Sequence, residues 1–404
     1  MRTMLLGLLA STALATRAAA ADVRSISRIA FGPDNTVFVA DWKAARIHAL
    51  RLTPAAPAAA RPFNVRDLRG VLARSVGVPV VIDDMAARPG TGQVYVAFDY
   101  GAARTPALAQ VLPDGSVRRV DLRAAAATSV ALADAPNGRY AFWGEIPERS
   151  FTVTDMTWHG GELFVAGLSN QEFASTLRRV HYPFDGRVAT TSVEIYHASH
   201  NQIETRAPIR AMTIVDLGGD PYLVAAYTCT PLVSIPLAAL TDGAHVRGKT
   251  LAELGYGNTP SGMITYARSD NGKSAPYVLL TNYERSSDLV PVAAVQAANT
   301  GAGLTEPVPF GMTRGLDPVQ LPFAGVTRVD NLDDQFLVAV RNDAYTGQTQ
   351  LVTIDKRYQF RVSDFVSEYN FPGYRYSADF QAKYIRPVQD TLKRQEGFGG
   401  AARP

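Results

Sequence analysis

The chain has 404 residues, with 40 lysines and arginines, 37 aspartates and glutamates, 47% apolar residues, 32 glycines, 25 prolines and one cysteine. This composition excludes a disordered chain, a collagen-like chain and a small disulfide-stabilised domain. Because Cys229 is the only cysteine, an intramolecular disulfide, c-type haem attachment and a cysteine-rich zinc site are also excluded.

Residues 1–21 have the pattern of a secretory signal peptide. Arg2 precedes an apolar run over residues 5–15, and a run of alanines ends at Ala20 and Ala21, where we expect cleavage. The apolar run is shorter than the roughly 20 residues that a membrane span requires. We therefore expect a soluble periplasmic or secreted protein with no membrane span after cleavage; a retained anchor helix is the alternative.

Without Arg2 and Arg17 of the signal peptide, 38 basic side chains face 37 acidic ones. The charges are mixed along the chain, and no basic stripe is present that would neutralise a phosphate backbone. Nucleic acid is therefore not an expected partner, whereas a small molecule or another exported protein is.

Short β-branched and aromatic runs between turn residues recur through the chain and favour an all-β fold. A strand-turn-strand pattern occurs six times, centred on Ile29, Met85, Met156, Met212, Met263 and Val329. These centres are 51 to 71 residues apart, which predicts a six-bladed β-propeller with inserted loops. Seven blades remain open, because the longest gap holds a further expected strand pair at 128–132 and 140–143.

The predicted domains are a signal peptide over 1–21, a β-propeller over 22–365, and a C-terminal strap with a short helix over 366–404. Leu68, Leu72 and their neighbours have helical spacing, which predicts a short amphipathic helix between two blades. We expect the C-terminal helix to be interrupted at Pro387.

The first copy runs from Ile29 to Asp41 and is followed by Arg46 and Ile47. It resembles the NHL-type propeller blade in its turn, its valine-rich strand, its aspartate and its later Arg-Ile pair, although alanines precede Arg46 where that family usually has Asn. NHL-like and SMP-30-like propellers include lactonases, lyases and binding platforms. The resemblance therefore implies the fold and leaves open whether the chain is an enzyme.

In a propeller, the residues just beyond each second strand lie on the face where the channel opens, and a ligand is expected there. The candidate ligand-binding residues on this face are Asp41, Asp99, Tyr227, Asn282, Arg341 and Asn342. Carboxylate and amide oxygens are the ligands that Ca²⁺ prefers. The alternative is that these Asp and Asn side chains cap strands and form turns.

The segment 197–210 gathers two of the six histidines, a glutamate and two arginines. His197 and His200 are three residues apart and could bind Zn²⁺ with Glu204 as a third ligand. Arg206 and Arg210 could bind an anionic ligand, because guanidinium groups match carboxylates in geometry. A merely polar loop and salt bridges between blades are the alternatives.

The chain has no nucleophile-elbow, P-loop, zinc-protease or dinucleotide-binding motif, so a nicotinamide nucleotide is not expected. Cys229 follows a strand-like run, which favours a small buried residue over a nucleophile. The sequence thus predicts a non-enzymatic propeller that binds a small molecule, a metal ion or a partner protein. The alternative is a metal-assisted hydrolase or lyase of the lactonase kind.

Overall fold

The computed structural model describes residues 19–20, 22–270, 273–344, 346–357, 371–395 and 398. Within these ranges the chain consists mainly of antiparallel strands and has few helices. None of the described helices has the length and apolar character needed to cross a membrane. Most of the predicted signal peptide lies outside the described residues, but Ala19–Ala20 form β1, which pairs with β10.

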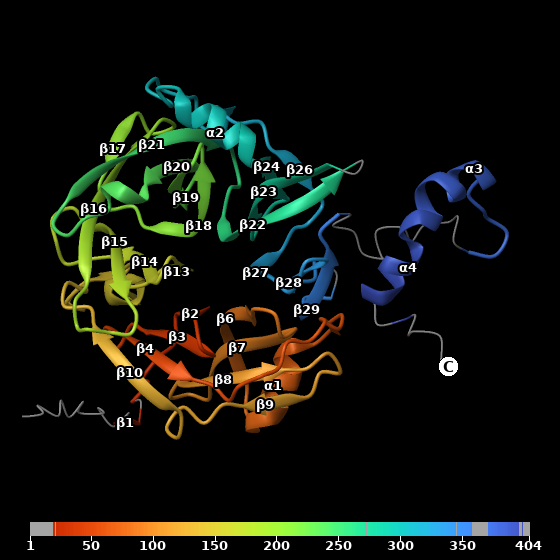
Figure 1. The fold of residues 1–404 in the computed structure, drawn as a ribbon, viewed down its shortest axis with the longest axis horizontal. Coiled ribbons are helices and arrows are strands. Elements are labelled where there is room, and N and C mark those ends of the chain that lie inside the picture. The colour runs from red at the N-terminus through yellow and green to blue at the C-terminus, as the bar shows by residue number, and fades with distance from the viewer. Residues whose placement is uncertain are drawn as a thin grey trace, which may run out of the picture.

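The strands are arranged in repeated antiparallel units around a centre, which gives a β-propeller-like architecture (Figure 1). The first strands are β2 (Arg28–Phe31), β6 (Val80–Arg88), β13 (Asp155–His159), β18 (Ile209–Leu217), β22 (Pro260–Asp270) and β27 (Val326–Asn331). The second strands are β3 (Thr36–Asp41), β7 (Gln93–Tyr100), β14 (Glu162–Leu168), β19 (Asp220–Tyr227), β23 (Lys273–Asn282) and β28 (Phe336–Asn342). The third strands are β4 (Arg46–Arg51), β8 (Thr105–Val111), β15 (Ser175–His181), β20 (Pro231–Pro236), β24 (Ser287–Pro291) and β29 (Thr349–Asp355).

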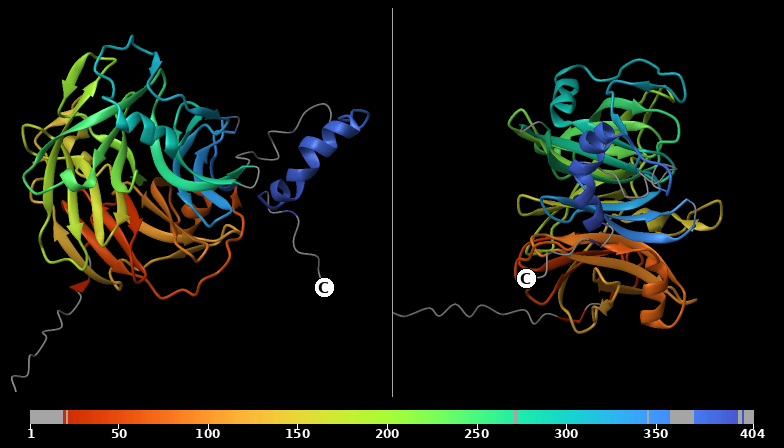
Figure 2. Two further views of the ribbon diagram at one scale, coloured as in Figure 1. Left: turned by 45° about the horizontal axis from the view of Figure 1, so that its top comes forward. Right: turned by 90° about the vertical axis from the view of Figure 1, so that its right-hand side faces the viewer.

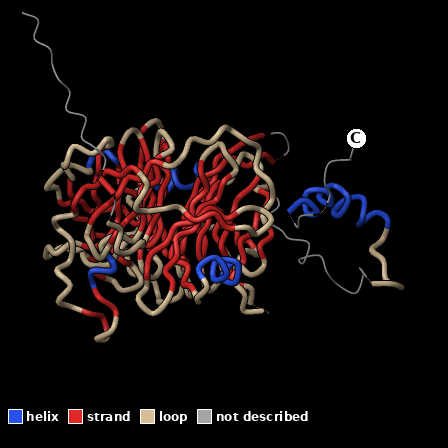
Figure 3. The backbone as a smooth tube through the Cα atoms, turned by 90° about the horizontal axis from the view of Figure 1, so that it is seen from below, coloured by secondary structure: helices blue, strands red, loops and turns tan. Residues whose placement is uncertain are grey.

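A further strand covers the outer edge of each unit. These outer strands are β10 (Ala126–Ala131), β9 (Val117–Arg119), β16 (Ala189–His197), β21 (His245–Leu254), β26 (Val319–Leu321) and β5 (Asn64–Val65). Parallel pairing of β16 with β21 joins two units into one ten-stranded sheet, which also includes β17 (Gln202–Glu204) and β25 (Thr313–Arg314). Seen from another side, strands fill the body of the ring and loops cover both of its faces (Figure 3).

The order of the units around the ring differs from their order in the chain. The first strand β2 contacts β6 on one side and β13 on the other, and β6 contacts β27. The N-terminal unit is therefore inserted between the two units that follow it in the sequence. The apolar core agrees with this order, because Phe98 of β7 is buried in one cluster with Val338 of β28, and Phe38 of β3 in another with Val165 of β14.

The ring closes through a short strand from the N-terminal part of the chain. In β5, Val65 pairs with Leu351 and Asn64 with Val352 of β29, so the last unit takes its outer strand from the segment that follows β4. Phe63, directly before β5, is fully buried in the core between β29 and β7. Pairing of this kind covers a sheet edge that would otherwise be exposed.

The prediction that residues 128–132 and 140–143 pair with each other is wrong. Its first half is β10, which pairs with β4 and completes the N-terminal unit. Its second half is β11 (Ala141–Phe142), which pairs with β12 (Ile146–Pro147) in a separate two-stranded sheet. The β-branched pattern of residues 128–132 indicates a strand correctly but does not specify its partner.

The predicted helix before the second copy is confirmed as α1 (Leu68–Val76). Asp67 caps its N-terminus by accepting a hydrogen bond from Gly70 at 2.8 Å, and Gly77 ends it in the left-handed conformation. Leu68 and Leu72 form the buried face. The short helical turns η1 (Glu148–Phe151) and η2 (Leu237–Ala239) and the helix α2 (Val292–Thr300) connect strands elsewhere.

The described C-terminal residues form a helical segment of α3 (Ala378–Phe380), η5 (Gln381–Ile385) and α4 (Arg386–Gln395) beside β29, outside the ring (Figure 2). The helical backbone continues through Pro387, but its hydrogen-bonding pattern changes just before this proline, from the π-helical turn η5 to the α-helical α4. Val388 and Leu392 are buried, whereas Phe371 and Tyr374 are exposed. The first part of the predicted C-terminal strap, residues 366–370, lies outside the described residues.

Candidate functional site

The first strands line a central cavity of about 650 Å³. All six residues on which the sequence repeats are centred lie in its wall: Ile29, Met85, Met156, Met212, Met263 and Val329. The repeat is therefore the sequence pattern of the channel lining.

Four of the first strands contain a β-bulge near their beginning, each at the position two residues before the repeat centre. The residues in these bulges are Asp83, Arg210, Ser261 and Thr327. A bulge leaves one residue out of the pairing register and redirects its side chain. Three of the four, Arg210, Ser261 and Thr327, line a second cavity at the beginning of the first strands.

This second cavity, the arginine mouth, has a volume of about 460 Å³. It is lined by Arg28, Phe151, Arg210, Thr228, Cys229, Asn258, Thr259, Pro260, Ser261, Tyr283, Thr327 and Arg328. Three of these residues are arginines and none is acidic. Arg28, Ser261 and Arg328 also line the central cavity, so the two spaces adjoin at these side chains.

The three arginines differ in how they are neutralised. The Nε atom of Arg328 lies 2.5 Å from Oδ1 of the buried Asp84, and its other nitrogens donate to backbone carbonyls. Arg28 donates to the carbonyl of Ser27 at 2.7 Å. Within the described part of the chain, the guanidinium of Arg210 has neither a hydrogen bond nor an ion pair.

Burial and mutual repulsion act on these cations together. Burial lowers the pKa of Arg28 to about 10, and the charge of Arg328 acts in the same direction. Burial and Arg328 likewise lower the pKa of Arg210. Both groups still carry a full charge at neutral pH. From the adjoining central cavity, Asp155 acts against the lowered pKa of both arginines, and Asp84 acts against that of Arg28. The lining of the arginine mouth itself carries only positive charges, which an anion would stabilise.

Aspartates on the first strands hold neighbouring units together. Asp84 accepts a hydrogen bond from Ile29 N at 2.7 Å, and Asp155 accepts one from Met212 N at 2.7 Å. Burial raises the pKa of Asp155 to about 6, although the nearby positive charge of Arg28 acts against this shift. These carboxylates are occupied by backbone donors, so they position strands around the channel.

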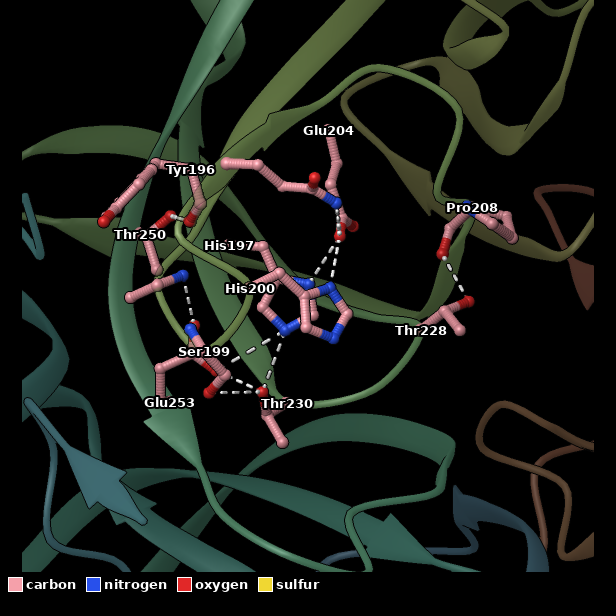
Figure 4. Close-up of polar contacts among 12 residues, drawn as sticks. Tyr196, His197, Ser199, His200, Glu204, Pro208, Thr228, Thr230, Thr250 and Glu253 are labelled. Atoms are coloured by element: carbon pink, nitrogen blue, oxygen red, sulfur yellow. Dashed lines mark hydrogen bonds and ion pairs between the residues drawn. The ribbon is translucent and has the colours of Figure 1, made fainter. Parts of the chain in front are cut away.

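Beside the arginine mouth lies a polar cluster of the two predicted histidines (Figure 4). The Nδ1 atoms of His197 and His200 lie 2.9 Å and 2.7 Å from the same oxygen, Oε1 of Glu204. The two imidazole rings are 3.7 Å apart between centroids. Burial acts to raise the pKa of Glu204, but the hydrogen bonds from both histidines outweigh it and hold this pKa at about 2.

A second carboxylate supports the other side of His197. The Nε2 atom of His197 lies 3.1 Å from Oγ1 of Thr230, and Thr230 donates its hydroxyl hydrogen to Glu253. Glu253 is fully buried and also accepts the backbone N–H groups of Ala198 at 2.7 Å and Ser199 at 3.2 Å. The turn after β16 is thus tied to β21 and to the start of β20.

Cys229 connects this cluster to the arginine mouth. It lies in the bend between β19 and β20, adopts a positive φ of 75°, and is half-buried, contrary to the expected buried packing within a strand region. Its sulfur and one nitrogen each of His197 and His200 lie within 4.8 Å of one another. Burial raises the pKa of the Cys229 thiol, and the charge of Glu253 adds to the shift.

Two predicted ligand residues at the ends of second strands serve the local structure. Asp41 is fully buried and accepts hydrogen bonds from Arg24 N at 2.6 Å and Ser25 Oγ at 2.7 Å. Asp99 forms an ion pair with Arg104 at 2.9 Å, and burial raises its pKa. Neither lines the central cavity or the arginine mouth.

The other predicted residues are dispersed. Tyr227 is buried in the core, where burial raises the pKa of its hydroxyl, and Asn282 is buried and accepts a hydrogen bond from Thr259 N at 3.0 Å. Asn342 lies at the end of β28 and binds the Thr349 hydroxyl at 2.8 Å, next to the half-buried Arg341. Arg206 is exposed and lies outside both cavities.

The structure therefore brings together two sets of predicted residues, Arg210 in the arginine mouth and His197, His200 and Glu204 beside it. Sequence reasoning missed Arg28 and Arg328. Both stand immediately before a repeat centre, as do Asp84 and Asp155. Aligning the six copies and examining the column before the centre would have found them.

No protein-family model matches the chain, and no curated protein sequence matches it. Among solved structures, one described as BBS1N in complex with ARL6DN, soaked with mercury, is 10% identical, with 83% of this chain and 79% of that chain covered and a TM-score of 0.32. Hydrazine synthase of Kuenenia stuttgartiensis is 12% identical, with 87% of this chain and 100% of that chain covered and a TM-score of 0.32. The propeller-like arrangement is accordingly derived from the sheets and contacts of this chain itself.

Proposed function

We propose that this chain is an exported, six-bladed β-propeller that binds a small anionic molecule in its arginine mouth without transforming it. The observation that carries the proposal is the guanidinium of Arg210, which has no partner among the described residues, in a cavity that also contains Arg28 and Arg328 and no acidic lining residue. Asp155 attracts Arg210 through space, and the ligand supplies the directly bonded partner that the guanidinium lacks in the described part of the chain.

The proposed count of six blades is supported by the units around the channel. Each first strand is followed by two paired strands and covered by a fourth, and the six first strands contact one another in a closed cycle. The NHL-type pattern of the first copy supports kinship with NHL-like or SMP-30-like propellers as part of the same proposal.

The cavity sets the class of ligand. A volume of about 460 Å³ falls in the range of about 300 to 1,000 Å³ that is usual for small-molecule sites. Guanidinium groups bind planar carboxylates and phosphates through paired N–H donors. The hydroxyls of Ser261 and Thr327 at the wall already donate to the carbonyls of Val326 and Val340, so the arginines are the main donors for a ligand. A small dicarboxylate or a phosphate compound satisfies both the charge and the size.

The test is calorimetric titration of the mature protein with succinate and, separately, with inorganic phosphate, supported by thermal shifts. We expect binding of at least one of the two, and a loss of affinity of about tenfold or more in Arg210→Gln, since a charged hydrogen bond is worth about 1.5 to 3 kcal/mol. Arg206→Gln is the matched control, because Arg206 is exposed and lies outside the cavity. No binding of either anion, or equal binding by Arg210→Gln, would contradict the proposal.

Export has its own test. Residues 1–21 carry the signal-peptide pattern, so we expect the protein in the periplasmic or secreted fraction with a new N-terminus directly after Ala20 or Ala21. Intact-mass measurement of the purified protein decides this point, and a full-length mass with Met1 retained would rule out cleavage.

The second candidate function is a metal-assisted hydrolase or lyase of the lactonase kind. The observation in its favour is the histidine cluster, which reaches the arginine mouth through Cys229. A bound cation there could polarise a carbonyl group of a substrate held by the arginines. Turnover of simple lactones that depends on added Zn²⁺ and disappears in Cys229→Ser would favour this function over binding alone.

A further inference from the structure

We infer that His197, His200 and Cys229 form a binding site for one Zn²⁺ ion beside the arginine mouth. The site adjoins the proposed anion site, because Cys229 also lines the arginine mouth, but it does not depend on anion binding, since none of its three ligands is an arginine. It also changes the expected ligand set, because Cys229 takes the place that the sequence suggested for Glu204.

The donor atoms select the metal. Imidazole nitrogen and thiolate sulfur are ligands for Zn²⁺, whereas Ca²⁺ takes oxygen ligands. The three candidate atoms lie within 4.8 Å of one another. Because Zn–N and Zn–S bonds are about 2.0 to 2.3 Å long, tetrahedral ligands lie about 3.3 to 3.6 Å apart, and a movement of about 1 Å closes the site. His200 and Cys229 are both partly exposed, so their side chains have room for this movement.

Glu204 fixes the orientation of both histidines. An ionised carboxylate only accepts hydrogen bonds, so the Nδ1 atoms of His197 and His200 donate to it, and Nε2 is the nitrogen of each ring that Glu204 leaves for a metal. Histidine ligands of zinc commonly donate their second nitrogen to a carboxylate in this way. Glu204 is therefore a positioning residue that directs two Nε2 atoms.

The surroundings of His197 favour a cation at Nε2. Thr230 uses its hydroxyl hydrogen in the bond to Glu253, so the oxygen that faces Nε2 at 3.1 Å has no hydrogen to donate. Glu253 is also near, with Oε2 3.8 Å from Nε2, and both side chains are fully buried. The Thr230 oxygen and the Glu253 carboxylate lie beside Nε2, and Glu204 binds the other nitrogen of the same buried ring. A positive ion at Nε2 stabilises this arrangement.

The experiment uses the mature protein, stripped with EDTA and titrated with Zn²⁺ and with Co²⁺. We expect one equivalent of each metal to bind, and a thiolate-to-cobalt charge-transfer band in the near ultraviolet. Cys229→Ser should abolish the band, and His200→Ala should weaken Zn²⁺ binding by about 100-fold or more. Glu204→Gln, which removes the charge on the orienting group, should weaken it by about 10 to 100-fold.

A second measurement uses the single thiol of the chain. The reaction of Cys229 with a thiol reagent such as DTNB should be slowed by Zn²⁺ in the wild type and unaffected by Zn²⁺ in His200→Ala. His245→Ala is the matched control, because the side-chain exposure of His245 is 38% against 39% for His200, and its ring binds Glu194 away from the cluster. Circular dichroism confirms that each variant is folded.

Three outcomes would overturn the inference: no stoichiometric metal binding, a cobalt spectrum without a thiolate band, or equal Zn²⁺ affinity in His200→Ala and the wild type. In each case the two histidines would only stabilise the turn after β16, through their hydrogen bonds to Glu204. Succinate or phosphate binding is measured without metal, so failure of the metal site and failure of the anion site are distinguishable.

Discussion

The Oδ2 atom of Asp84 accepts a hydrogen bond from the backbone N–H of Ile29 at 2.7 Å, although 55 positions separate the two residues. The bond crosses from β6 to β2, and the other oxygen of the same carboxylate pairs with Arg328 on β27 at 2.5 Å. One buried side chain thus joins three first strands of the ring.

Asp84→Ala should destabilise the protein by about 3 to 5 kcal/mol, because it leaves the partly buried Arg328 without its partner and Ile29 N–H without its acceptor. The free energy of unfolding in urea measures the effect. Asp317→Ala is the control, since Asp317 is exposed, and should change stability by less than about 0.5 kcal/mol. Equal stability of the two variants would show that the Asp84 contacts do not hold the ring.

Asp83 makes stability depend on pH. Burial, reinforced by repulsion from Asp99, raises its pKa from 3.8 in the unfolded chain to about 8 in the fold. Between these values the folded state binds more protons than the unfolded state, so stability decreases as the pH rises from about 4 to 8. Asp83→Asn removes this loss and should be more stable than the wild type by on the order of 2 kcal/mol at pH 9, with little difference at pH 4.

Thermal denaturation of both proteins at pH 4, 7 and 9 tests the Asp83 prediction. The difference between the two melting temperatures isolates Asp83 from the other groups that titrate in this range. A difference that stays constant with pH would contradict it.

Closure of the ring depends on Phe63. Its side chain is fully buried between β29 and β7, so Phe63→Ala should cost about 3 to 5 kcal/mol. Phe310→Ala is the control, because Phe310 is 68% exposed. Urea denaturation measures both, and proteolysis near β29 should be faster in Phe63→Ala only. A small effect in both variants would mean that β5 does not hold the ring closed.

Gly167 allows a close approach of two chain segments. A Cβ atom at this position would lie 2.0 Å from the carbonyl oxygen of Thr152, and backbone cannot move aside as a flexible side chain can. Gly167→Ala should therefore destabilise the protein by more than about 2 kcal/mol. Gly301→Ala, where the nearest atom would be 3.6 Å away, should be close to neutral. Melting temperatures compare the two, and equal values would refute the proposed steric role.

The sequence repeat predicted the first strands because a first strand has the same surroundings in every unit. Met85, Met156, Met212 and Met263 recur at corresponding positions, where each packs in an apolar core and lies in the wall of the central cavity. The order of the units around the ring could not be predicted from the same repeat pattern. Nothing local in residues 126–131 distinguishes pairing with β4 from pairing with a strand that follows, because a β pattern specifies a face and a length but no partner.

The site was predicted only in part for a related reason. Residues beyond the second strands were expected at the mouth, but Asp41 and Asn282 accept hydrogen bonds from backbone N–H groups 17 and 23 positions before them in the chain. Arg210 reaches the mouth because a β-bulge redirects it. Sequence patterns do not reveal a bulge, whereas the His197–Glu204 spacing did bring its members together because they share one short turn.

The ring order also bears on how the chain matures as it emerges from the ribosome. The edge of β4 stays uncovered until β10 arrives, since Arg46 and its partner Ser129 are 83 positions apart. The segment before β5 remains unpaired for longer, because the backbone N–H of Phe63 donates to the hydroxyl of Thr353, which is synthesised 290 positions later. β5 is thus among the first strands to be synthesised and the last to be paired, and a nascent polypeptide halted before β29 would present unpaired β5 residues to any chaperone or neighbouring chain.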